Sequence, residues 1–127
     1  MTVKLILGAL FLLALFAAFQ RWSGGGERID AASFADRPSD AVVVDVRTPD
    51  EYGTGHIAGA VNMNLFDDFE ERMAGFDRER PVYLYCASGG RSGRAASILE
   101  RLGFETVVNA GGYGDLVAAG AETSTEP

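Results

Sequence analysis

Two short apolar runs, AVVVDV at residues 41–46 and PVYLYC at residues 81–86, place the strongest constraint on the fold of this 127-residue chain. The first is β-branched and apolar almost throughout, which is typical of a strand buried on both faces of a parallel sheet. A helical stretch follows each run, and parallel strands need a crossover of that kind between them. The alternation therefore predicts one α/β domain with a central parallel sheet and helices on both of its faces.

Shorter patterns complete the predicted order of elements. Residues 60–65 and 104–110 are further candidate strands, and residues 111–120 are expected to form a turn and a short helix. Residues 91–103 place their apolar side chains on one helical face and end at Gly103, a residue type that commonly follows a helix.

Two other helices are expected from their end signals and periodicity. One begins at Pro49, because Thr48 can cap it and Glu51 completes a capping box. The other, over residues 66–76, is acidic on one face. Its predicted apolar face consists of Phe66, Phe69 and Met73.

The start of the chain differs from the rest. An uncharged apolar stretch runs from Leu5 to Phe19, short for a spanning helix of ~20 residues and long for a signal core of ~7–15 residues. Small residues are poorly placed for cleavage, so we expect a single-pass anchor that meets the membrane through residues 3–22, rather than a cleaved signal and a secreted protein. A signal-like start favours a periplasmic or other extracytoplasmic domain over a cytoplasmic one.

The expected organisation follows from these patterns. Residues 1–22 form a membrane anchor or signal segment and residues 23–28 a flexible linker. Residues 29–120 form the α/β domain, and residues 121–127 a flexible polar tail.

Composition excludes several classes of function. The formal net charge is -7 and no Lys/Arg-rich run occurs, which argues against nucleic acid as a partner. One cysteine and one histidine allow neither an intrachain disulfide nor a metal site of the usual Cys/His kind. The composition therefore predicts no metal site of this kind.

The single cysteine stands in YCASGGRSGR, residues 85–94, where a strand meets a helix. A loop that curls around the sulfur directs backbone N–H groups and the helix N-terminus at it, and such an anion nest favours a thiolate. Cys86 is therefore the candidate nucleophile, with Arg91 as a charge-assisted donor for an anionic substrate. The candidate substrate-binding loop comprises Ala87, Ser88, Gly89, Gly90, Arg91 and Ser92.

With these motifs the sequence resembles the single-domain rhodanese family of sulfurtransferases, from Ile29 to Ala119. The resemblance rests on DVRTPDEYGTGHIAGAVNMNL, on the cysteine loop CASGGRSGRA and on GFETVVNAGG, in that order along the chain. Ala58 stands where the family commonly has proline, and Leu116 where a tryptophan often follows the double glycine. The resemblance implies a rhodanese-like three-layer fold after the N-terminal hydrophobic helix.

The resemblance also implies a reaction that needs no cofactor and no metal. The Cys86 thiolate would take the outer sulfur of thiosulfate or another small sulfur-containing anion, and would pass it from a persulfide to cyanide, a thiol or a protein acceptor. A membrane-tethered persulfide carrier with little free turnover is the alternative. A phosphatase or arsenate reductase is disfavoured, because those relatives carry arginine six positions after the cysteine and Arg91 is five positions after it.

Three polar residues are expected to support the site rather than to react. Asp45 and Arg47 end the strand of residues 41–46, and an ion pair or loop anchor is favoured over proton transfer. His56, in the family's Gly-His-Ile-x-Gly-Ala motif, is expected to hold its loop through a hydrogen bond.

Overall fold

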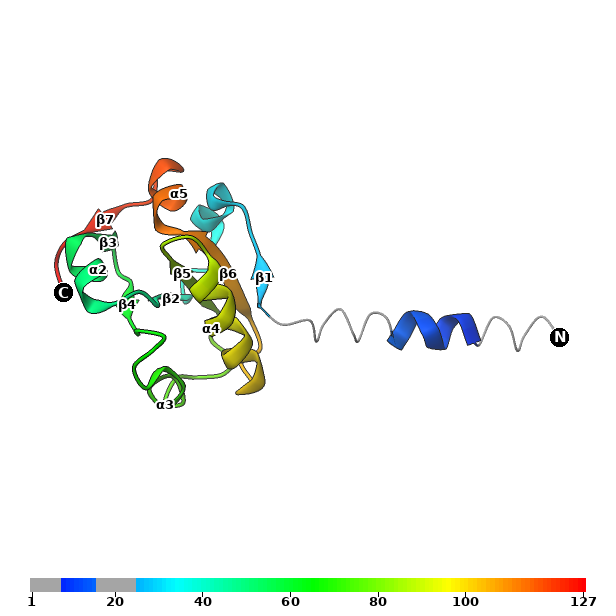
Figure 1. Cartoon of the computed structure of the whole chain (residues 1–127). Helices are drawn as coiled ribbons and strands as arrows, with labels where there is room; N and C mark the ends of the chain where they lie inside the picture. Colours follow the sequence, from blue (N-terminus) through cyan, green and yellow to red (C-terminus); the bar gives the residue numbers. More distant parts are fainter. Residues whose placement is uncertain (1–7, 16–24) are drawn as a thin grey trace.

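The computed structural model describes residues 8–15 and 25–127, and its centre is a five-stranded parallel sheet in the order β1-β6-β5-β2-β4 (Figure 1). Every pairing within this sheet is parallel. The predicted central parallel sheet is thus confirmed. The strands are β1 (Glu27–Arg28), β2 (Val42–Asp45), β4 (Val61–Asn62), β5 (Val82–Cys86) and β6 (Val107–Gly112).

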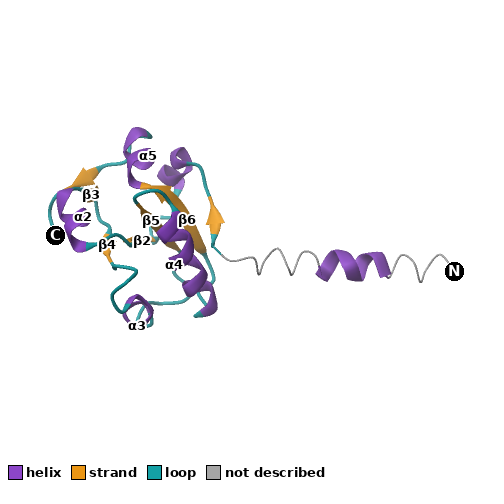
Figure 2. Ribbon diagram, viewed as in Figure 1, coloured by secondary structure: helices purple, strands orange, loops and turns teal. Residues whose placement is uncertain are grey.

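Helices cover both faces of the sheet, as Figure 2 shows. Helices α3 (Phe69–Met73) and α4 (Gly90–Arg101) pack together on one face. The 3-10 helix η1 (Ala31–Asp36) and helix α5 (Tyr113–Ala118) pack together on the other face. Helix α2 (Pro49–Thr54) follows β2. This arrangement confirms the three-layer α/β fold.

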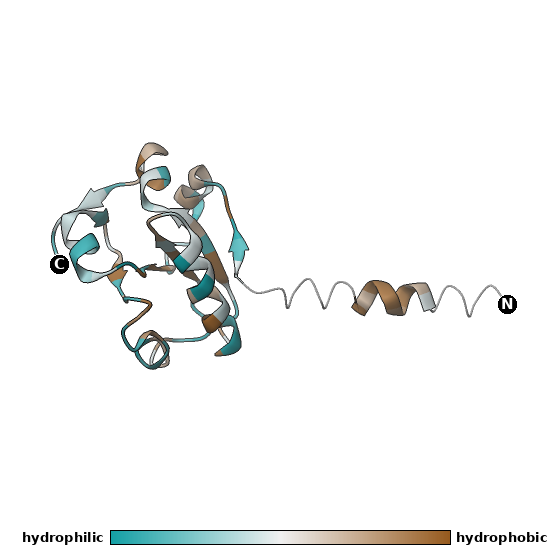
Figure 3. Ribbon diagram, in the orientation of Figure 1, coloured by the Kyte–Doolittle hydropathy of each residue, from teal (hydrophilic) through white to brown (hydrophobic). Residues whose placement is uncertain are grey.

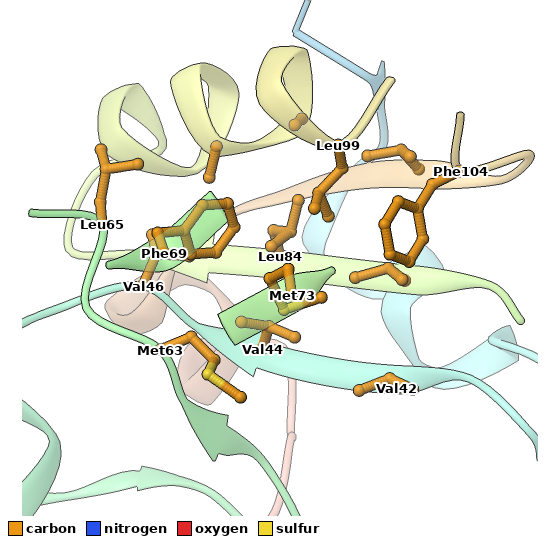
Figure 4. Packing of buried hydrophobic residues seen from close by; sticks show 14 of the residues in the cluster. Val42, Val44, Val46, Met63, Leu65, Phe69, Met73, Leu84, Leu99 and Phe104 are labelled. Atoms are coloured by element: carbon orange, nitrogen blue, oxygen red, sulfur yellow. The ribbon is translucent and has the colours of Figure 1, made fainter. Parts of the chain in front are cut away.

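Each face of the sheet has its own apolar core. Under α3 and α4, Val44, Leu84, Met73 and Leu99 are completely buried (Figure 4). Burial of one such side chain stabilises the fold by about 1.5–3 kcal/mol. Figure 3 shows the central strands as the hydrophobic part of the domain, with polar residues on the outer surface of α4. The strands are therefore held in place on both sides, and the end of β5 is a rigid position.

The predicted end signals of two helices are confirmed. The Thr48 hydroxyl accepts a hydrogen bond from the Glu51 N–H, and the Glu51 carboxylate accepts one from the Thr48 N–H, so the capping box begins α2. At the end of α4, Gly103 has a φ of 90°, a left-handed conformation that glycine adopts at little cost.

Two elements are shorter than predicted. The strand expected at residues 60–65 is reduced to β4, and the helix expected over residues 66–76 is reduced to α3. Asp68 has a φ of 51°, so it cannot continue a helix and α3 begins only after it. The placement of Phe66 on the buried face was wrong, because it precedes the helix and is 67% exposed.

The C-terminal segment differs from the flexible tail expected at residues 121–127. Strand β7 (Thr123–Ser124) pairs antiparallel with β3 (His56–Ile57). The Ala58 N–H also donates to the Glu122 carbonyl at 2.9 Å. Backbone hydrogen bonds thus fix this part of the segment, which a composition rich in polar residues does not reveal.

The described residues include only part of the predicted N-terminal anchor. Residues 8–15 are helical, and no helix among the described residues is long and apolar enough to cross a membrane. The remainder of the anchor segment, residues 1–7 and 16–22, lies outside the described residues, so the anchor stays a prediction. The predicted end of the linker of residues 23–28 was wrong, because Glu27 and Arg28 form β1, which pairs with β6.

Candidate active site

Cys86 is the last residue of β5, at the carboxyl edge of the sheet, and α4 begins four residues later. The side chain is completely buried. The Gly89 N–H donates to Sγ at 2.9 Å. Gly89 has a φ of 98°, which lets the chain turn back over the sulfur before the helix starts. Residues 87–92 therefore wrap around the sulfur, and they form the cradle of Cys86.

Hydrogen bonds in the cradle set the acidity of the thiol. Burial alone would raise the pKa of Cys86, but hydrogen bonding from Ser92, Ser88 and Gly89 opposes it. The Gly89 N–H donates to Sγ at 2.9 Å, and the Ser92 hydroxyl oxygen lies 3.4 Å from Sγ. Together these donors lower the pKa of Cys86 below its ordinary value. The arrangement favours a thiolate, the reactive form of cysteine.

A glycine turn at the end of β6 packs against the cysteine loop. A Cβ atom on Gly112 would lie 2.7 Å from the Ala87 carbonyl oxygen and 3.3 Å from Cα of Ser88. No real side chain tolerates the first distance, so only glycine lets β6 approach the loop this closely.

Asn109 in β6 is a functional residue that sequence reasoning missed. Its Oδ1 accepts hydrogen bonds from the Ser92 hydroxyl at 2.7 Å and the Gly111 N–H at 3.0 Å. Its Nδ2 donates to the Gly89 carbonyl at 3.1 Å. The only available signal was a polar residue at the end of a β-branched strand. Asn109 therefore holds both ends of the loop in one buried network.

Arg91 does not face the solvent as an unpaired cation. Its guanidinium donates to both carboxylate oxygens of Glu51, at 2.7 and 2.9 Å. Hydrogen bonding to Arg91, opposed by partial burial, lowers the pKa of Glu51 to about 2. Sequence reasoning placed Glu51 only in the capping box. The structure gives it a second role, as the partner that compensates the charge of Arg91.

Asp45 and Arg47 form a buried ion pair, with 2.8 Å between Oδ2 and Nη2. Arg47 also donates to the Gly55 carbonyl at 2.7 Å. The Tyr85 hydroxyl donates to Asp45 Oδ2 at 2.7 Å and accepts from the Ile57 N–H at 3.0 Å. This network anchors the segment after α2 beside β5, which is the supporting role expected for both charged residues.

His56 lies away from the cradle. Its ring stacks on Tyr52 with 3.7 Å between centroids, and its Nδ1 lies 3.1 Å from the Tyr52 carbonyl oxygen. The expected structural hydrogen bond is present, and no contact with Cys86 is seen. Among residues 8–15 and 25–127, no group of three or more His, Cys, Asp or Glu side chains could hold a metal ion.

Comparison with known proteins gives a consistent result. A sequence profile for the "Rhodanese-like domain" matches residues 30–119. The protein YqhL of Bacillus subtilis, named "Uncharacterized protein", is 33% identical over 107 residues, which are 84% of this chain and 84% of that protein. Thiosulfate sulfurtransferase PspE of Escherichia coli is 40% identical over 75 residues, covering 58% of this chain and 71% of that protein.

A solved structure described as "rhodanese with anions from E. coli" resembles the fold with a TM-score of 0.61 and 34% sequence identity. The match covers 68% of this chain and 99% of that chain. The similarity to named sulfurtransferases supports sulfur transfer as the general activity. With its cysteine cradle at the end of a parallel strand, the chain belongs to the rhodanese-like family of proteins.

Proposed function

We propose that the protein is a sulfurtransferase that takes sulfane sulfur from thiosulfate or a persulfide and passes it to cyanide or a thiol. The observation that carries this proposal is the cradle of donors around Cys86, which lowers the pKa of its thiol. A thiolate that accepts from the Gly89 N–H, just before the N-terminus of α4, can attack sulfur, and the same groups can stabilise the anion that results.

In the first half-reaction, Cys86 Sγ attacks the outer sulfur of thiosulfate. A new S–S bond forms, the S–S bond of thiosulfate breaks, and its electron pair leaves with sulfite. The terminal sulfur of the Cys86 persulfide carries the negative charge. In the second half-reaction, cyanide or a thiolate bonds to this terminal sulfur, the S–S bond of the persulfide breaks, and its electron pair stays on Sγ as the Cys86 thiolate. No oxidant or reductant is consumed when the acceptor is cyanide.

A second candidate function is a persulfide carrier that discharges only to a dedicated protein partner. The complete burial of Cys86 favours it, because a carrier must shield its persulfide from small thiols. A phosphatase or arsenate reductase is less well supported, because Arg91 is five residues after Cys86 and is paired with Glu51 rather than directed into the loop.

The discriminating experiment measures thiocyanate formation from thiosulfate and cyanide, and the intact mass of the chain after thiosulfate alone. An enzyme forms thiocyanate through many turnovers, and Cys86→Ser abolishes it while the urea unfolding midpoint stays close to wild type. A carrier gains about 32 Da on Cys86 yet releases little thiocyanate. Undiminished turnover in Cys86→Ser would refute both functions.

We also propose that residues 3–22 tether the domain to a membrane, with the domain outside the cytoplasm. The support is the uncharged stretch from Leu5 to Phe19 between Lys4 and Arg21. Membrane fractionation, protease accessibility in intact cells and N-terminal sequencing of the recovered chain test this together. Recovery of the full-length chain from the soluble fraction contradicts the tether.

A further inference from the structure

The cation that sequence reasoning assigned to substrate, Arg91, is held by Glu51 through two hydrogen bonds. A side chain that attracts an anion to the cradle must therefore carry a positive charge other than that of Arg91. A local positive charge matters more in this protein because its net charge of -7 repels a dianion such as thiosulfate.

Arg28 in β1 is placed on the same side of the sheet edge as the cysteine loop. β1 lies at the edge of the sheet beside β6, as Figure 1 shows. Arg28 is in register with Asn109, and paired residues of parallel strands direct their side chains to the same face of a sheet. Asn109 contacts the Gly89 carbonyl on that face. Arg28 therefore projects toward the cysteine loop.

The distances agree with this placement. A Cβ atom added to Gly89 would lie 3.3 Å from Arg28 Nη2 and 3.4 Å from Cα of Gly111. Gly89 is the residue whose N–H donates to the sulfur of Cys86. The Arg28 guanidinium thus lies next to Gly89, on the side of the loop that faces Gly111.

Arg28 also meets the requirement of available charge. In the part of the chain that the structure describes, the side-chain ion pairs with carboxylates are those of Arg47 and Arg91, and Arg28 takes part in neither. Its side chain is exposed, so the positive charge is open to a ligand that approaches the loop from solvent.

We propose that Arg28 is a specificity-determining residue of the site, which recruits the anionic end of the sulfur donor to the Cys86 cradle. This inference rests on the proposed function and names the group that recognises the donor. One charge acting on a dianion across a solvent-exposed gap changes its capture by roughly 3- to 10-fold at low ionic strength. The effect declines with added salt, because the screening length falls from ~10 Å at 0.1 M to ~3 Å at 1 M.

The first test compares kcat/KM for thiosulfate in wild type, Arg28→Gln, Arg28→Lys and Arg101→Gln, using the full chain in a non-ionic detergent. Arg101 is the matched control, because it is exposed and lies at the opposite end of α4. We expect Arg28→Gln to lose roughly 3- to 10-fold through KM at low salt, with kcat unchanged and the loss reduced at 1 M salt. Arg28→Lys retains most of the value, and Arg101→Gln matches wild type.

The second test does not depend on turnover. Neutral iodoacetamide alkylates Cys86, the only cysteine, and sulfite is added as a competing anion while intact mass records the adduct. We expect sulfite to slow alkylation of wild type at a concentration several-fold lower than it requires for Arg28→Gln. If wild type forms no thiocyanate but this difference remains, the proposed function fails and the role of Arg28 stands. If Arg28→Gln equals wild type in both tests, or equals Arg101→Gln, the role of Arg28 is overturned.

Discussion

The ion pair between Glu51 and Arg91 yields a prediction that separates it from the helix cap of which Glu51 is also part. Glu51→Gln removes the charge but keeps a side-chain oxygen that can still accept from the Thr48 N–H, since glutamine also completes a capping box. The substitution therefore tests the pairing with Arg91 while it leaves the start of α2 intact.

The magnitude follows from the acidity of Glu51. Its pKa falls from an ordinary value of ~4.3 to about 2, and at ~1.36 kcal/mol per unit this corresponds to an upper limit of about 3 kcal/mol. The side chains of Arg91 and Glu51 remain 27% and 34% exposed, and pairs in contact with solvent contribute less than their acidity suggests. We expect Glu51→Gln to lower the free energy of unfolding by about 1 kcal/mol at pH 7.

The lowered pKa of Glu51 also predicts how the free energy of unfolding changes with pH. A carboxyl group whose pKa is lower in the folded state stabilises the protein fully above its unfolded pKa of ~4.3, and loses that contribution as pH falls toward about 2. Urea unfolding of wild type, Glu51→Gln, Arg91→Gln and the double variant, at pH 7 and at several values between pH 5 and pH 3, completes a double-mutant cycle.

The coupling energy between the two substitutions is expected to be about 1 kcal/mol at pH 7 and to diminish steadily below pH 4. A coupling energy near zero at pH 7, or one of equal size at pH 3, would refute this reasoning. The same variants bear on function, because Glu51→Gln releases the charge of Arg91 and is expected to raise kcat/KM for thiosulfate by a few-fold.

Two further predictions concern the cradle itself. Gly112→Ala forces a methyl group against the Ala87 carbonyl, so we expect the free energy of unfolding in urea to fall by about 1–3 kcal/mol and most sulfur transfer to be lost. Gly114→Ala is the control, because its methyl group meets no atom within 4 Å, and equal behaviour of the two variants contradicts the packing argument. Ser92→Ala removes the hydroxyl that lies 3.4 Å from Sγ, so we expect the pKa of Cys86 to rise and the pH midpoint of its alkylation by iodoacetamide to move upward. An unchanged midpoint would mean that the backbone N–H groups alone set the acidity.

Local patterns predicted the parts of the site that adjacent residues build. The capping box of Thr48 and Glu51 and the cradle around Cys86 each lie within a few residues of one another, so their chemistry could be derived from spacing alone. The ion pair of Asp45 and Arg47 belongs to the same group, since its members are two positions apart.

Other features depend on which strands become neighbours, and spacing does not determine that. Asn109 and Arg28 reach the cysteine loop because β6 and β1 lie beside β5 in that order with a particular register. Phe66 was misplaced for a different reason. A single residue in a left-handed conformation, Asp68, ended the helical period that placed it on the buried face.

The parallel pairing of β6 has a consequence for a chain that is still being made. The cysteine loop is held in shape partly by β6, because Asn109 donates to the Gly89 carbonyl and Gly112 packs against Ala87. Both residues are synthesised after Cys86 and reach the loop only when β6 docks on β5. Until β6 pairs with β5, these contacts are missing, and the loop lacks the support that holds the Gly89 N–H against the sulfur. Cys86 therefore acquires its full lowering of pKa only after the part of the chain that follows it has been made and β6 has docked.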